Sequence, residues 1–252
     1  MIRALLAWLV VWVALPAAAQ EESVVLGMSQ NRVQITARFD GSEILIFGAV
    51  KRETPIPDTP LDVVITVAGP SMPVTVHRKD RRFGIWVNAE LVEIDHAPSF
   101  YAVATSGPVD EVLSHTEDLR HQVTVPRAVR SVGSGAEDPI SFTVALIRIR
   151  RADGTYQTLP NTVEIDQQTL FDTNIALPSN LIEGSYAVRV FLMREGRVVS
   201  DFETAIEVRK AGLERWIYNL AQENALIYGI LSLIIAVAAG WAASAAFRAI
   251  RG

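Results

Sequence analysis

The chain has 252 residues, of which 50% are hydrophobic and 20% charged, a balance typical of a globular protein rather than a disordered one. All 28 Asp and Glu lie between residues 20 and 224, together with 20 of the 23 Lys and Arg, so this central part has a net charge of −8. An acidic surface argues against nucleic acid as a partner, because phosphate binding needs a basic face. The absence of cysteine excludes disulfides, thiolate metal sites and a cysteine nucleophile.

The first 19 residues are typical of a secretory signal peptide. Arg3 precedes the apolar core Ala4–Leu15, Pro16 follows it, and Ala17–Ala19 places small residues before the expected cleavage site. As a helix, the core would span roughly 18 Å, which is too short for a hydrocarbon layer of about 30 Å. This length disfavours an uncleaved anchor, so we expect residues 1–19 to be removed.

The segments between residues 20 and 210, which we call the exterior region, are predicted to be mainly β. Short runs rich in Val and Ile alternate with Gly and Pro, which is the pattern of a β-sandwich. The predicted strands are Val33–Ala37, Ile44–Val50, Leu61–Ala68, Pro73–His77, Phe83–Asn88, Phe100–Thr105, Val163–Ile165, Leu170–Leu177, Ser185–Arg194 and Val198–Arg209. We expect two immunoglobulin-like sandwich units, residues 20–125 and 138–210, joined by a linker at residues 126–137.

Each unit is expected to contain one short helix. The first is Val109–Leu119, the only stretch of the first unit with a helical pattern. The second is 139–152, where Asp138 and Pro139 form a typical helix start and Phe142 begins an apolar stripe. The alternation of residues 142–146 also fits a strand, so that alternative stays open.

A run of cations lies between two predicted strands. His77–Arg82 carries four fixed positive charges in six residues of an acidic region, and we expect Arg78–Arg82 to form a polar turn. A solvated hairpin tip explains this run. The functional alternative is a recognition loop for an anion, or for an acidic or lipid-headgroup surface, since the arginine fork suits oxyanions. The candidate binding residues are Arg78, Lys79, Arg81, Arg82, Trp86 and Asn88.

The segment Ala211–Asn224 is predicted to form an amphipathic helix. Leu213, Trp216, Ile217 and Leu220 recur with helical spacing and form one apolar stripe. Such a helix would lie at a membrane surface. The alternative, which is equally open, is that this segment only extends the apolar helix that follows it.

Ala225–Phe247 contains 23 residues without a charge, enough for a helix of about 34 Å, and predicts a transmembrane helix. A buried helix of a soluble protein is the alternative. A cleaved signal followed by one stop-transfer helix would put the exterior region outside the cytoplasm and residues 248–252 in the cytoplasm. The protein is thus expected to be an integral, single-pass membrane protein.

Small residues spaced by four, Ala236, Gly240 and Ser244, form a stripe on this helix that would let a second helix approach closely. Because Ala and Gly are common in membrane spans, a chance pattern explains the stripe equally well.

No arrangement of residues indicates a reaction. His77, His96, His115 and His121 lack the spacing of metal ligands, and no nucleophile motif is present. We expect no cofactor, no metal and no enzymatic activity. The exterior region is expected to serve as a binding module.

Several blocks of the chain resemble the alphaproteobacterial putative transmembrane protein family. These blocks are Phe39–Ala49, Val63–Pro70, Val76–Asn88, Pro98–Ser106, Leu213–Ala221 and Tyr228-Gly229. The family has no established reaction, and its genes often lie beside a permease similar to sulfite exporters. The resemblance therefore implies an accessory role at a membrane transporter. It also implies a location in the bacterial inner membrane, with the exterior region in the periplasm. The alternatives are an envelope scaffold or solute sensor that binds an anion at residues 77–82, and an enzyme with a scattered site.

Overall fold

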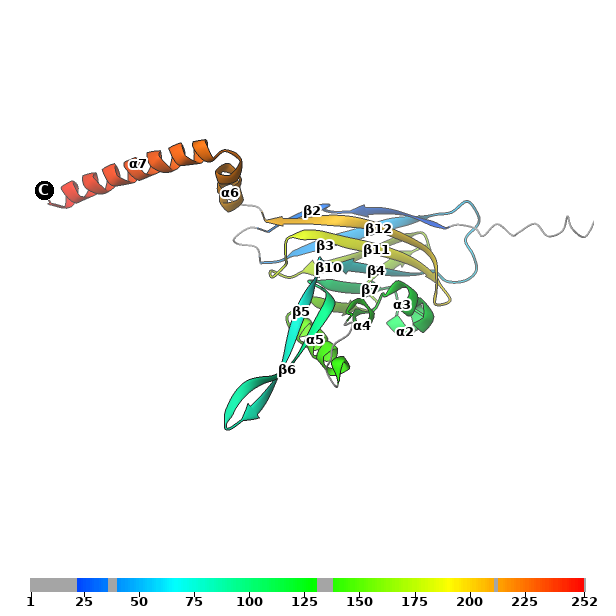
Figure 1. The fold of residues 1–252 in the computed structure, drawn as a ribbon. Coiled ribbons are helices and arrows are strands. Elements are labelled where there is room, and N and C mark those ends of the chain that lie inside the picture. Colours follow the sequence, from blue (N-terminus) through cyan, green and yellow to red (C-terminus); the bar gives the residue numbers. More distant parts are fainter. Residues whose placement is uncertain (1–21, 36–39, 131–137, 211–212, 252) are drawn as a thin grey trace, which may run out of the picture.

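The computed structural model describes residues 22–35, 40–130, 138–210 and 213–251, and its centre is a sandwich of two β-sheets (Figure 1). The expected signal peptide, residues 1–19, lies outside the described residues. The first sheet has the order β1 (Ser23–Met28), β3 (Ser42–Lys51), β10 (Leu170–Leu177), β9 (Glu164–Asp166). The second has the order β2 (Arg32–Ile35), β12 (Arg197–Lys210), β11 (Gly184–Arg194), β4 (Asp62–Ala68), β7 (Tyr101–Thr105), β8 (Tyr156–Leu159).

The mainly β prediction is confirmed, but the division into two sandwich units is wrong. Strands from both predicted units pair within each sheet, for example β3 with β10 and β4 with β11. The pairs β2–β12 and β7–β8 are parallel and also join the two predicted units. Strands from both predicted units thus share one sandwich, and the predicted linker at 126–137 does not separate two sandwich domains.

Four helices cover one face of the second sheet, so the molecule has three layers (Figure 1). They are α2 (Val109–Val112), α3 (His115–His121), α4 (Val125–Ala128) and α5 (Pro139–Ala152). The single helix predicted at 109–119 is two helices, because Ser114 interrupts it and its hydroxyl caps α3 at the Glu117 amide. The helix predicted at 139–152 is confirmed, with the Asp138 carboxylate accepting from the Ser141 amide.

Two apolar cores explain why some strands are apolar along most of their length and others alternate between apolar and polar residues. One core lies between the sheets, and the other lies between the second sheet and the helices. Strand β4 is buried on both faces, with Val63 and Ile65 in the first core and Val64 in the second, which accounts for its mostly apolar sequence. Strand β10 has only one buried face and therefore alternates.

The close approach of β3 to its neighbours depends on Gly48. A Cβ atom there would lie 2.4 Å from Cζ of Phe171 and 2.8 Å from the carbonyl oxygen of Val25. We expect Gly48→Ala to lower the free energy of unfolding by about 1–3 kcal/mol, because a packed core absorbs added volume poorly. Denaturant unfolding of the detergent-solubilised chain would measure this. The exposed substitution Glu43→Ala on the same strand is the control, and an equal effect of both would contradict the packing argument.

A third pair of strands, β5 (Ser71–Arg82) and β6 (Ile85–Pro98), leaves the sandwich as a long hairpin (Figure 1). Its base is fixed to the second sheet by Tyr156, whose hydroxyl donates to the carbonyl oxygen of Pro98 at 2.8 Å. Burial raises the pKa of Tyr156 to about 12, although the charge of Arg150 opposes the shift. The hydroxyl therefore keeps the proton that it donates across the neutral pH range.

Helices α6 (Leu213–Glu223) and α7 (Ala225–Arg251) follow the sandwich. Asn224 separates the two helices, which run in different directions (Figure 1). The segment before the apolar helix is therefore a separate helix and not its upward continuation. Helix α7 contains a candidate membrane span, Ala225–Ala245, with mean hydropathy 2.2 and none of its most apolar window buried.

Candidate functional site

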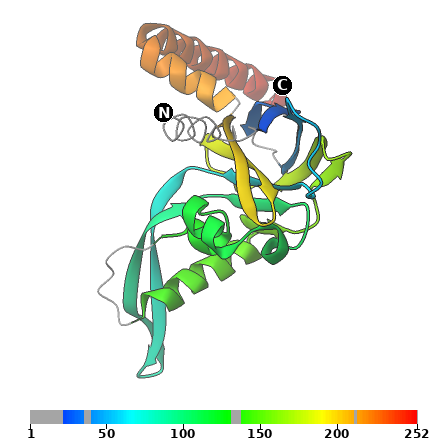
Figure 2. The same cartoon turned by 90° about the vertical axis from the view of Figure 1, so that its right-hand side faces the viewer.

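The candidate site is the outer part of the β5–β6 hairpin, residues 77–91, which we call the arm. Figure 2 shows it extending past α5 on the side of the sandwich opposite to α6 and α7. The structure corrects one prediction here, because Arg78–Arg82 are not a turn but the last residues of β5. The turn consists of Phe83 and Gly84, since Arg82 pairs with Ile85.

The arm is rooted in the helical layer. Val92 and Ile94 of β6 are buried in the second core, directly below the arm. Above them, the Arg78 guanidinium lies 5.0 Å from the ring centroid of Phe142 on α5 and 2.6 Å from the Glu90 carboxylate. A cation over an aromatic face and an ion pair both restrain this side chain. Arg78 therefore positions the arm on the helical layer.

The strand register divides the predicted binding residues between two faces. Lys79 is opposite Asn88 and Arg81 is opposite Trp86. Because side chains alternate along a strand, these four residues share one face of the arm, which we call the Trp86 face. Arg78 and Arg82 lie on the other face, so the structure does not bring all six predicted residues together.

The two faces also differ in charge pairing. On the face away from Trp86, Arg78 pairs with Glu90 at 2.6 Å and Arg82 with Asp80 at 3.5 Å. Neither Lys79 nor Arg81 forms an ion pair with any residue that the structure describes. The free cations of the run are thus those beside Trp86.

The end of the arm exposes three large apolar side chains. Phe83 is fully exposed, Trp86 is 68% exposed and Ile85 is 65% exposed. Single exposed apolar residues are ordinary, but a cluster at the end of a projecting element marks a binding surface. We call Phe83, Ile85 and Trp86 the tip. Sequence reasoning included Trp86 but missed Phe83 and Ile85.

The histidines do not form a site with each other. His121 lies 3.3 Å from Glu117, and Nδ1 of His96 lies 3.4 Å from the carbonyl of Ala128. Among the residues that the structure describes, no three His, Asp or Glu side chains are placed to hold a metal ion.

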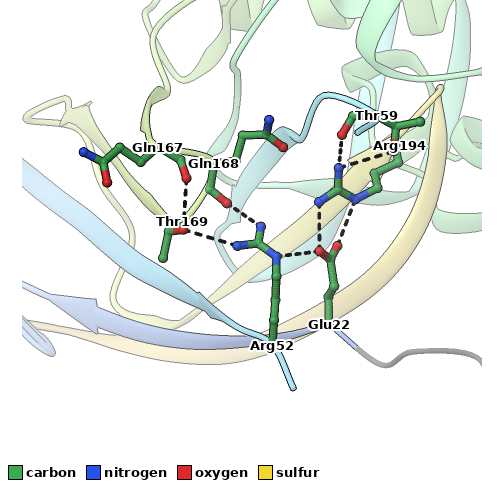
Figure 3. Close-up of polar contacts among 7 residues, drawn as sticks. All are labelled: Glu22, Arg52, Thr59, Gln167, Gln168, Thr169 and Arg194. Atoms are coloured by element: carbon green, nitrogen blue, oxygen red, sulfur yellow. Dashed lines mark hydrogen bonds and ion pairs between the residues drawn. The ribbon is translucent and has the colours of Figure 1, made fainter. Parts of the chain in front are cut away.

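A buried ion cluster at one end of the sandwich was also missed. The Glu22 carboxylate lies between two guanidinium groups, 2.6 Å from Arg52 and 2.8 Å from Arg194 (Figure 3). These three side chains are only 7–10% exposed. The arginines also donate to the carbonyls of Gln168 and Thr59.

The cluster ties segments of both sheets to the start of the described chain. Arg52 follows β3 of the first sheet, whereas Arg194 ends β11 of the second. Burial opposes ionisation of Glu22, but hydrogen bonds and attraction from Arg194 and Arg52 outweigh it and hold the pKa of the carboxyl below its usual value. All three side chains are bound by groups of the fold itself, so we interpret this cluster as a structural tie rather than a binding site.

The predicted helix-packing residues Ala236, Gly240 and Ser244 are all exposed on α7. A Cβ atom added at Gly240 would meet nothing within 4 Å. The stripe is therefore open to a neighbouring helix, and its use for packing stays a prediction.

The family described as Putative transmembrane protein (Alph_Pro_TM) matches residues 23–249. The chain belongs to this family. The family resemblance expected from the sequence is thus confirmed, and together with the apolar helix α7 it makes the protein a membrane protein with a β-rich part. A link to a transporter is not part of this finding.

No curated protein matched the chain. Among solved structures, it is similar to the sporulation control protein Spo0M from Bacillus subtilis, with 11% sequence identity and a TM-score of 0.29. The match covers 81% of this chain and 56% of that protein, so the chain spans little more than half its length. A likeness at this level carries no argument about fold or function.

Proposed function

We propose that the protein is a non-enzymatic binding protein of the bacterial inner membrane, an accessory subunit of a membrane transporter. In this proposal α7 is the anchor, the sandwich lies in the periplasm, residues 248–252 are cytoplasmic, and the arm is the binding element. The partner class is an anion exporter of the sulfite-permease type, which the family resemblance suggested.

The observation that carries the proposal is the exposed tip and its cations. Phe83, Ile85 and Trp86 project from the fold on an element that belongs to neither sheet of the sandwich. Aromatic residues and arginine are the groups that contribute most to binding energy at protein interfaces. Anchoring by α7 would strengthen binding through the arm, because a partner held in the same membrane has a high effective concentration near the arm.

The alternative is a solute sensor that binds an anion at residues 77–82. Its supporting observation is the pair of free cations, Lys79 and Arg81, on the Trp86 face. Against it, Arg78 and Arg82 already have carboxylate partners and lie on the other face, so the four cations do not converge on one anion. This arrangement favours an extended binding surface over a small-anion pocket.

Co-purification from native membranes tests the proposed function. A tagged full-length chain, extracted with styrene–maleic acid copolymer, should enrich a membrane transporter. We expect the triple substitution Lys79→Ser, Arg81→Ser, Trp86→Ser to reduce its recovery at least about tenfold, because it removes two or three strong contacts.

The matched control is the double substitution Arg197→Ser with Val199→Ser. It changes exposed residues at the start of β12, a strand of a different hairpin. It should leave recovery unchanged. Absence of any transporter from the purified material, or equal recovery with the arm variant and the control, would contradict the proposed function.

A further inference from the structure

The turn of the arm holds an aromatic residue in a conformation that costs stability. Phe83 has φ of +51° and Gly84 has φ of +86°, the two positive values of a type I′ hairpin turn. Asn, Asp and Gly suit the first position of this turn, whereas a bulky residue there is strained. Because Phe83 is fully exposed, no packing inside the fold offsets the strain. A strained, exposed aromatic residue points to a contact outside the chain.

The surroundings of Phe83 indicate the chemistry of that contact. The tip forms an apolar end to the arm. Directly before it in the chain, the last residues of β5 carry three cations: Lys79 and Arg81 on the Trp86 face, and Arg82 opposite Ile85. Aromatic rings prefer the boundary between lipid headgroups and acyl chains, and neighbouring Lys and Arg bind anionic headgroups. An apolar end with a cationic border fits a bilayer surface better than it fits water.

The arrangement of the fold brings the tip toward the membrane. Figure 1 places the end of the arm and α6 at the same end of the sandwich, beyond which α7 extends. Figure 2 shows them on opposite sides of the sandwich. If the bilayer begins near the first residues of α7, the arm would therefore contact it at a second point, separate from α7.

We infer that the tip of the arm inserts into the surface of the membrane that holds α7 and binds anionic phospholipid there. This inference rests on the proposed use of the arm as a binding element and names what its tip binds. Two attachment points on opposite sides fix the tilt of the sandwich, so the part of the arm between Asn88 and the sandwich is held at the level where a membrane transporter emerges from the lipid.

Fluorescent labelling tests this inference directly, because the chain contains no cysteine and one introduced thiol is unique. The full-length Ile85→Cys chain carries an NBD label and is reconstituted into phosphatidylcholine vesicles with or without phosphatidylglycerol. We expect a blue shift and a gain in emission, larger with phosphatidylglycerol, and quenching by lipids that carry a nitroxide near the headgroup. A label at Val199→Cys, near the β11–β12 turn at the start of β12, should remain in water.

A second variant separates membrane contact from folding. Phe83→Asn removes the apolar ring and suits the turn, so it should raise the melting temperature slightly while abolishing most of the emission gain at residue 85. Glu195→Asn is the matched control, because Glu195-Gly196 forms the equivalent turn with φ of +51° and +73°. It should also stabilise the chain but leave the emission gain intact.

Equal, water-like emission at residues 85 and 199 in both kinds of vesicle would overturn the inference. If the arm variant still lost its transporter in the co-purification experiment, the arm would bind protein instead of lipid, and the proposed function would stand without this inference. A lipid-like signal in vesicles that contain only the purified chain supports the inference whether or not a transporter is recovered.

Discussion

Glu22→Ala is expected to lower the free energy of unfolding by about 3 kcal/mol, because it leaves two buried guanidinium groups without their shared carboxylate. Glu22 contacts Arg52 at 2.6 Å and Arg194 at 2.8 Å, and its side chain is 9% exposed. Denaturant unfolding followed by circular dichroism would measure the loss. The control is Glu207→Ala, whose exposed pair with Arg209 at 3.2 Å should contribute less than about 1 kcal/mol.

The same cluster predicts a pH dependence with a definite sign. The pKa of Glu22 in the folded chain is lowered from its ordinary value of 4.5, so the carboxylate stabilises the fold fully above that value. This contribution is lost as the pH falls through the lower pKa of the folded state. Glu22→Gln should remove this part of the acid sensitivity. Equal stability and equal acid sensitivity of the Glu22 and Glu207 variants would contradict the assigned role.

Substituting Ile234 and Ile235 with arginine should release the chain from the membrane. Both residues lie in the middle part of the apolar span Ala225–Ala245, and both are exposed. Each arginine at the centre of a bilayer costs about 2.5–3.5 kcal/mol on insertion scales. Carbonate extraction would measure this, and we expect the wild-type chain in the pellet and the double variant in the supernatant or degraded.

Gly240→Leu is the control for this experiment, because it keeps the span apolar and should stay in the pellet. If Ala236, Gly240 and Ser244 pack against a partner helix, the same control should also lower the recovery of the transporter. A double arginine variant that resists carbonate would show that α7 is not the anchor.

Elements with a local signal were predictable from the sequence. The helix at 139–152 begins at Asp138 and Pro139, a cap and a first-turn residue that lie next to each other in the chain. Strand β10 alternates because one face is buried, and its bounds agree with the prediction. The charge-free stretch before Arg248 predicted α7 from length and composition alone.

Pairing between distant strands was not predictable in this way. Gly48 and Phe171 are opposite each other in the sheet although more than a hundred residues separate them in the chain. Both halves of the chain carry similar strand patterns, so each half was interpreted as a separate sandwich. Such patterns show that a face is buried but not which strand lies beside it. The Glu22 cluster was missed for the same reason, since Arg194 is 172 residues away.

The basic run was misassigned because the arm lies outside the sandwich. Residues 78–82 are exposed, so no buried face imposes alternation on them, and a charged strand resembles a charged turn. Gly84 is a turn signal, but a phenylalanine before it is not the residue that a type I′ turn favours. The sequence hypothesis grouped Trp86 with the cations as binding residues, whereas the strand register divides these residues between two faces.

Site-specific crosslinking in intact cells tests most directly whether the arm is the binding element. A photoreactive amino acid replaces Trp86 in the full-length chain, and Val199 is replaced in a parallel experiment. Irradiation should give adducts with a membrane transporter and with phospholipid from position 86 but only background from position 199. Adducts of equal amount and identity from both positions would contradict the account.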